Sequence, residues 1–103
     1  MCKKSNQSTD GTSFQNVTFK ASVQQLINVF GEPTVHDNTG EDKVNFEWDM
    51  ETEDGDVFTI YDWKEYRKLD LDETIEFHIG SFSKSISNIA QEEVEKALNT
   101  YVN

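Results

Sequence analysis

An apolar stripe with helical spacing, enclosed by a cap and a stop signal, is the feature that most restricts the fold. Four apolar residues recur at intervals of three and four positions: Val23, Leu26, Ile27 and Phe30. Such spacing places them on one face of a helix. Ser22 can cap its first turn, and Gln25 completes a capping box. Gly31 supplies a left-handed stop, and Pro33 forbids continuation. The pattern predicts a helix that begins after Ser22 and ends before Gly31.

After this helix the apolar period changes from helical to two. Val44, Phe46, Trp48 and Met50 alternate with charged and amide residues, which is typical of a half-buried strand. The Asp54-Gly55 dipeptide predicts a hairpin turn before a second strand over 57–63. Alternating apolar residues predict a third strand over 75–79, which Gly80 ends.

The resulting order is helix, three strands, helix, with the second helix running from Ser83 or Ser85 to the C-terminus. We therefore expect an α+β fold: a two-layer domain with an antiparallel three-stranded meander and both helices on one face. The other sheet face should carry polar side chains and face water. Residues 1–13 are predicted to be a disordered polar tail. Residues 14–103 are predicted to be a single domain, entered by an extended segment over 14–19.

The negative charge is concentrated in one part of the chain. The formal net charge is −11, and residues 37–76 contain fifteen of the twenty acidic residues but only four of the nine basic ones. The remainder of the chain is neutral in sum. An acidic chain has no basic patch with which to bind nucleic acid directly, and it is equally unsuited to an anionic membrane surface.

Three acids of the first predicted strand, Glu47, Asp49 and Glu51, should point to one side of the sheet at intervals of about 6.8 Å. That interval resembles the roughly 6 to 7 Å between phosphates along one DNA strand. An acidic sheet face could therefore mimic DNA toward a basic surface of another protein. The alternative is that the acidic face binds nothing and serves only to keep a small protein soluble. The candidate partner-binding residues are Glu47, Asp49, Glu51, Glu53, Asp54, Asp56, Trp63 and Tyr66.

The second predicted strand is apolar on both faces. Either Val57, Tyr61 and Trp63 face the core, or Phe58 and Ile60 do. In both cases large apolar groups face away from the helices and form a patch rimmed by acids, which suits a protein interface or a nucleotide-stacking pocket. Alternatively, residues 14–19 cover this patch, or the chain forms a homodimer through it. The candidate residues for a small ligand are Tyr61, Trp63, Lys64 and His78.

The sequence contains no catalytic grouping, so we expect a protein that is not an enzyme and has no cofactor or metal. The acidic run from Asp49 to Gly55 is out of register with a calcium-binding loop. His36 and His78 match no metal-ligand spacing. No apolar run approaches the roughly 18 residues of a membrane span. The expected location is the host cytoplasm, or a lipid anchor on Cys2 if a signal peptide has been removed.

Several short motifs together resemble small uncharacterised accessory proteins of tailed bacteriophages. They are the segments FGEP at 30–33, KVNFEW at 43–48, DG at 54–55, TIYDWK at 59–64 and FHIG at 77–80. A more distant likeness is to the helix-then-sheet domains of small bacterial lipoproteins and β-lactamase-inhibitor proteins. The phage resemblance implies an accessory role and carries no catalytic residues.

These observations lead to one functional expectation with two alternatives. The chain is expected to bind and inhibit a host nucleic-acid-handling or defence protein, such as a CRISPR effector, through its acidic sheet face. The first alternative is a binding protein for a small molecule such as a nucleotide signal. The second is a structural protein associated with the virion.

Overall fold

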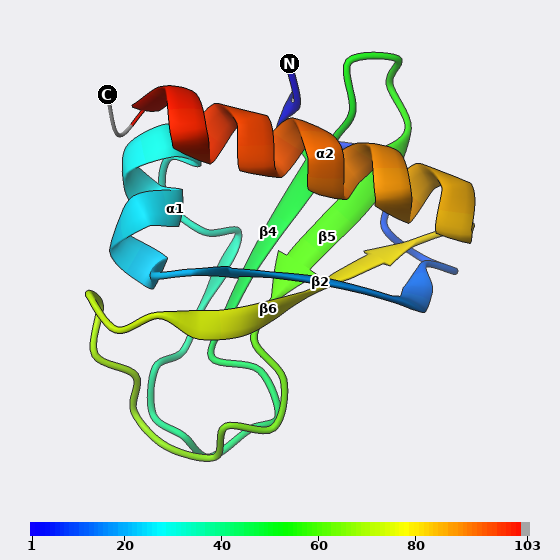
Figure 1. Ribbon diagram of the computed structural model, residues 1–103. Helices are drawn as coiled ribbons and strands as arrows, with labels where there is room; N and C mark the ends of the chain where they lie inside the picture. The colour runs from blue at the N-terminus through cyan, green and yellow to red at the C-terminus, as the bar shows by residue number, and fades with distance from the viewer. Residues whose placement is uncertain (102–103) are drawn as a thin grey trace.

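The structure, a computed structural model, describes residues 1–101 and confirms the α+β class (Figure 1). Within the described residues, six strands form one antiparallel sheet and two helices accompany it. The elements in chain order are β1 (Lys3–Lys4), β2 (Ser13–Ala21), α1 (Val23–Phe30), β3 (Val35–His36), β4 (Phe46–Glu51), β5 (Val57–Tyr61), β6 (Ile75–Ser81) and α2 (Lys84–Tyr101).

The sheet is larger than the predicted meander. The strands β4, β5 and β6 are neighbours as expected, but the full order is β1-β4-β5-β6-β2, and β3 also pairs with β4. The prediction of a sheet with only three strands is therefore wrong. β2 pairs with β6 across a large sequence separation, and β1 and β3 are two residues long. Neither a distant pairing nor so short a strand produces a local periodicity in the sequence.

The signals at both ends of α1 are confirmed. The Ser22 hydroxyl accepts the backbone N–H of Gln25 at 3.1 Å, and the Gln25 side chain accepts the backbone N–H of Ser22 at 2.8 Å. Gly31 ends the helix with φ of 89°, and its N–H donates to the Ile27 carbonyl at 2.8 Å. Glycine adopts this φ without the steric cost that a Cβ would bring. At α2, the Ser83 hydroxyl accepts the backbone N–H of Ile86.

One face of the sheet and both helices share a single hydrophobic core. The fully buried apolar residues of the sheet are Phe46, Trp48, Met50, Phe58, Ile60, Phe77 and Ile79. The helices add Val23, Leu26, Ala90, Val94 and Leu98 to the same cluster. Each large apolar side chain buried in this way contributes about 1.5–3 kcal/mol. The structure also decides the orientation of β5: Phe58 and Ile60 face the core, so Tyr61 faces the other side.

The last two residues of the predicted second helix lie outside the described residues.

The N-terminal segment differs from the predicted disordered tail. Lys3 and Lys4 pair with Glu51 and Met50 of β4, and Cys2 is 5% exposed within the core cluster. Burial, assisted by the charge of Glu93, raises the pKa of the Cys2 thiol to about 11. A lipid on this sulfur would therefore have to displace it from the core. Because residues 3–12 are polar, the sequence analysis did not predict that the segment after the buried Cys2 is ordered against the sheet.

No helix among the described residues is long and apolar enough to cross a membrane. The two ends of the sheet differ in what they carry. The β4–β5 hairpin projects at the top of Figure 1, and the loops over 37–45 and 62–74 hang together at the bottom.

Candidate functional site: the open sheet face

The sheet face opposite the helices, here called the open face, gathers most of the residues that the sequence singled out. Strand pairing places Glu47 beside Tyr61 and Tyr61 beside His78, while Asp49, Thr59 and Gly80 form the next row. Because side chains alternate along a strand, all six residues lie on the side away from the core. The predicted side-by-side placement of the β4 acids is therefore observed.

Aromatic rings from three parts of the chain meet on the open face. The Tyr61 ring centroid lies 6.0 Å from that of Trp63 and 5.6 Å from that of His78, and the Trp63 and His78 centroids are 6.3 Å apart. Phe14, from the start of β2, stacks on His78 with a centroid separation of 4.2 Å. These four residues are the aromatic cluster. Trp63 and Phe14 remain 38% and 39% exposed, so the cluster is accessible to another molecule.

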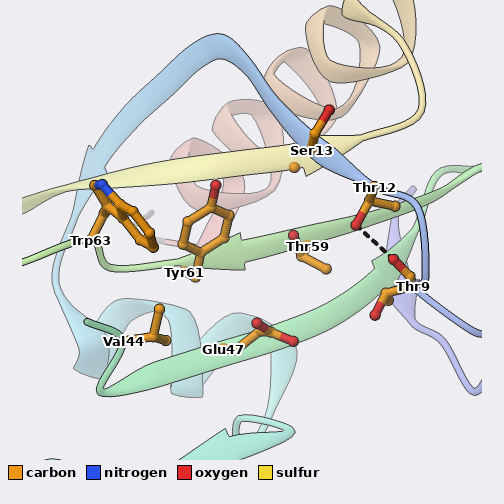
Figure 2. A pocket seen from close by; sticks show the side chains of 9 residues that line it. Thr9, Thr12, Ser13, Val44, Glu47, Thr59, Tyr61 and Trp63 are labelled. Atoms are coloured by element: carbon orange, nitrogen blue, oxygen red, sulfur yellow. Dashed lines mark hydrogen bonds between the residues drawn. The ribbon is translucent and has the colours of Figure 1, made fainter. Parts of the chain in front are cut away.

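Beside the aromatic cluster, the open face is hollowed (Figure 2). This open-face hollow has a volume of about 240 Å³. Val44, Tyr61 and Trp63 line one end, and Glu47 and Thr59 lie in the middle. Hydroxyl groups of the N-terminal segment close the other end; they belong to Thr9, Thr12 and Ser13. The segment expected to be a tail thus supplies one wall of the site.

Gly80 makes this hollow possible. A Cβ at this position would lie 2.7 Å from the Thr59 hydroxyl oxygen and 3.4 Å from a ring carbon of Tyr61. The distance to Thr59 is shorter than real Cβ contacts, whereas the distance to Tyr61 is an ordinary contact, so a larger residue would have to displace the Thr59 hydroxyl. From sequence, Gly80 was interpreted only as the end of a strand. It lies within β6 and is buried.

Glu47 is the most perturbed acid of the open face. Burial is the largest cause and the neighbouring Asp49 carboxyl the second; together they raise the pKa of Glu47 to about 7. Among the described residues, Asp49 Oδ1 is buried without a hydrogen-bond partner. The protonated form of Glu47 is favoured because burial and a neighbouring carboxyl both disfavour its charged form.

The rings next to Glu47 are also affected by burial. Burial, and then the charge of Glu47, raises the pKa of Tyr61. Burial lowers the pKa of His78, against the smaller opposite effect of Glu76. Both rings therefore remain uncharged near neutral pH.

The sequence predicted a row of three exposed carboxylates on β4, and the prediction of their exposure is wrong. Glu47, Asp49 and Glu51 are all half-buried. Glu51 lies 4.0 Å from the Lys3 ammonium and accepts a hydrogen bond from Gln7. The N-terminal segment contributes to this burial, because Gln7 contacts Glu51, and Thr9 and Thr12 line the hollow beside Glu47. Among the candidate partner-binding acids, the exposed ones are Glu53, Asp54 and Asp56 on the β4–β5 hairpin.

Trp63 is positioned by a buried carboxylate one residue before it. Asp62 is fully buried and accepts the backbone N–H groups of Asn45 at 2.9 Å and Phe46 at 2.8 Å. Burial raises the pKa of Asp62, while these N–H donors act in the opposite direction. The Lys64 N–H also donates to the Lys43 carbonyl at 2.7 Å. The loop that carries Trp63 is therefore fastened to the segment preceding β4.

Two lysines approach the exposed indole. Lys64 Nζ lies 5.5 Å and Lys43 Nζ 5.8 Å from the Trp63 ring centroid, within the range of cation–π attraction. Tyr61, Trp63, Lys64 and His78, the residues proposed for a small ligand, are thus brought together. Tyr66 is 55% exposed on the loop over 62–74 and has no ring contact with the aromatic cluster.

Some site residues escaped the sequence analysis. Phe14 was expected only as part of an extended segment over 14–19 that either enters the domain or covers the apolar patch, and Thr9 and Thr12 were assigned to a tail. Their positions depend on the pairing of β2 with β6, for which the sequence holds no local signal. Within residues 1–101, no group of three or more His, Cys, Asp or Glu side chains could hold a metal ion.

Comparison with known proteins adds no further assignment: no protein-family model, curated protein or solved structure matches this chain.

Proposed function

We propose that this chain is a non-catalytic binding protein whose open face attaches to a basic surface of another protein. The observation that carries the proposal is the accessible aromatic cluster in a chain of net charge −11. Tryptophan and tyrosine are enriched at the centres of protein interfaces, where they supply most of the binding energy. Phe14 and Trp63 would be the anchors that a partner buries.

Exposed acids at both ends of the sheet support a basic partner. Glu53, Asp54 and Asp56 lie on the hairpin, and further exposed acids lie on the loops at the opposite end. Charges placed around an interface accelerate encounter with a partner of opposite sign and exclude partners of like sign. The negative electrostatic field therefore comes from the exposed acids at the two ends of the sheet, and the aromatic cluster lies between these two ends.

The phage resemblance makes a bacterial nucleic-acid-handling or defence protein the partner class that we propose, with inhibition as the result. Mimicry of a phosphate row by Glu47, Asp49 and Glu51 is not favoured, because these side chains are half-buried and Glu47 has a raised pKa. An electrostatic contact by the exposed hairpin acids does not have this difficulty.

The test is affinity capture from a bacterial lysate with the wild-type chain and two variants, at low and high salt. Trp63→Ala removes an anchor of the open face, and Ile89→Ala removes an exposed apolar side chain from α2. We expect a basic protein that is retained by the wild type and by Ile89→Ala, is lost with Trp63→Ala, and is released by salt. Retention by both variants, or a captured protein without a basic surface, would contradict the proposal.

A second candidate function is nucleotide binding. The observation in its favour is that Tyr61, Trp63 and His78 form one cluster with the Lys64 ammonium beside the indole. Aromatic rings can stack on a base, and the lysine could contact a phosphate. A thermal-shift screen with nucleotides tests this function. Stabilisation that is lost with Lys64→Gln would support it, and the absence of any shift would reject it.

A further inference from the structure

Resting on the proposed function, we propose that the open-face hollow is the subsite for one arginine side chain of the basic partner. The hollow and the two rings at its end together provide what a guanidinium group requires: hydrogen-bond acceptors around its edge and an aromatic face against its plane. The inference concerns the ligand class of this hollow, and the proposed function concerns the whole face.

The side chains that line the hollow are acidic, hydroxyl-bearing, aromatic or apolar, and none of them is cationic. Glu47 provides a carboxyl group in the middle, and Thr9, Thr12 and Thr59 provide hydroxyl oxygens around it (Figure 2). A guanidinium group has five N–H donors and no acceptor, so such a lining satisfies it. An anionic ligand would meet the Glu47 carboxyl group instead.

The aromatic end of the hollow suits the same group. Tyr61 and Trp63 meet nearly edge to face, with an interplanar angle of 82°. Lys64 and Lys43 already place their ammonium groups within 6 Å of the indole, at 5.5 and 5.8 Å, so this ring attracts cations in the free protein. An arginine that enters the hollow would stack on the Tyr61 or Trp63 ring and would compete with Lys64 for it.

Occupation of the hollow would change the protonation of Glu47. The titratable groups that act on Glu47 are Asp49 on the same strand and Tyr61 on β5. A guanidinium beside Glu47 favours the ionised carboxylate, so binding should release a proton when Glu47 is protonated in the free chain. Since burial and Asp49 place the Glu47 pKa at about 7, the affinity for arginine should fall as the pH decreases from 8 to 6.

The experiment is an NMR titration of the 103-residue chain at pH 8 and low salt with N-acetyl-arginine methylamide as the probe. The two tryptophans serve as reporter and internal control. The Trp63 indole is 38% exposed at the hollow, whereas the Trp48 indole N–H donates to the Gly31 carbonyl at 2.9 Å in the core. We expect a saturable shift of the Trp63 indole resonance with no change at Trp48.

Two further probes and three variants identify the site. The citrulline analogue has nearly the same shape without the charge and should not bind, and the lysine analogue should bind several-fold more weakly. Glu47→Gln and Gly80→Ala should each weaken arginine binding at least fivefold. Glu92→Gln, which makes the same charge change on an exposed position of α2, should leave it unchanged.

Lys64→Gln distinguishes this ligand from a nucleotide. Removal of the competing ammonium should strengthen binding of the arginine probe, whereas it should weaken binding to a phosphate. The inference is wrong if the citrulline analogue binds as well as the arginine probe, or if Glu47→Gln binds like the wild type. These outcomes do not depend on the folding of Gly80→Ala.

The two proposals can fail separately. If no arginine probe binds but a basic protein still requires Trp63, the hollow is not an arginine subsite and the interface remains. If the probe binds and no basic protein depends on Trp63, the hollow is a cation site and the proposed function is wrong.

Discussion

The Phe14 ring stacks on the His78 imidazole, with ring centroids 4.2 Å apart and planes inclined by 19°. The contact joins the start of β2 to the middle of β6, next to an irregularity in the pairing between Phe14 and Thr18. It fastens the point where the N-terminal segment enters the sheet.

Phe14→Ala should therefore change the titration of His78. Burial lowers the pKa of His78, and removal of the covering ring admits water, so the pKa should rise toward the ordinary value of about 6.5. An NMR titration of the two histidines measures it, with His36 on β3 as the internal reference. A shift of both histidines together, or of neither, would show that Phe14 does not cover His78 in solution.

Glu47→Gln should alter how stability depends on pH. The Glu47 carboxyl group has a pKa of about 4.3 in the unfolded chain and about 7 in the folded protein. The free energy of unfolding therefore decreases as the pH increases from about 4.3 to about 7, because the folded protein disfavours the charged form. The amide abolishes this dependence. Above pH 7 the variant should be more stable by about 1–2 kcal/mol, a value reduced because the side chain is only half-buried.

Urea denaturation at pH 5 and pH 8 measures this effect, with Glu92→Gln as the control for net charge. An equal gain for both variants at pH 8 would assign the effect to the overall charge of −11 and not to the position of Glu47.

Asp62→Asn should lower the free energy of unfolding by about 2–3 kcal/mol, because a charge-assisted pair of backbone hydrogen bonds is weakened in a buried place. Asp56→Asn, an exposed change of the same kind on the hairpin, should stay within about 0.5 kcal/mol of the wild type. Chemical denaturation compares the two. Similar stabilities would mean that the Asp62 carboxylate does not hold the loop that positions Trp63.

Trp48→Phe should cost about 1–3 kcal/mol, because the Gly31 carbonyl loses its indole donor and the core loses volume. Trp63→Phe, the matched change at an exposed indole, should cost less than about 0.5 kcal/mol. Equal losses in thermal or urea unfolding would contradict the assignment of Trp48 to the core and Trp63 to the open face.

The elements that the sequence predicted well are those with local signals. The capping box of Ser22 and Gln25, the stop at Gly31 and the hairpin turn at Asp54-Gly55 all depend on neighbouring residues. The alternation along β4 also placed Glu47 and Asp49 on a common face correctly. In each of these cases the outcome depends on local backbone geometry and on residues that are close together in the sequence.

What the sequence could not predict is how deeply those side chains are buried. That depth depends on the N-terminal segment, whose course is set by Cys2 in the core and by the pairing of β2 with β6. The hollow has the same origin, since Thr9 and Thr12 line it only because this segment crosses from one sheet edge to the other. The close approach of Gly80 to Thr59 could be predicted only with the knowledge that these two residues are paired in neighbouring strands.

The pairing of β2 with β6 has a consequence for synthesis of the chain. Thr18 hydrogen-bonds to Glu76, 58 positions later. At a translation rate of about 5–20 residues per second, the ribosome needs about 3–12 seconds to make this distance. During that interval β2 lacks its partner strand β6, and its backbone edge is open to other chains. The open-face hollow therefore forms only after β6 has been synthesised, when the N-terminal wall can close around Gly80.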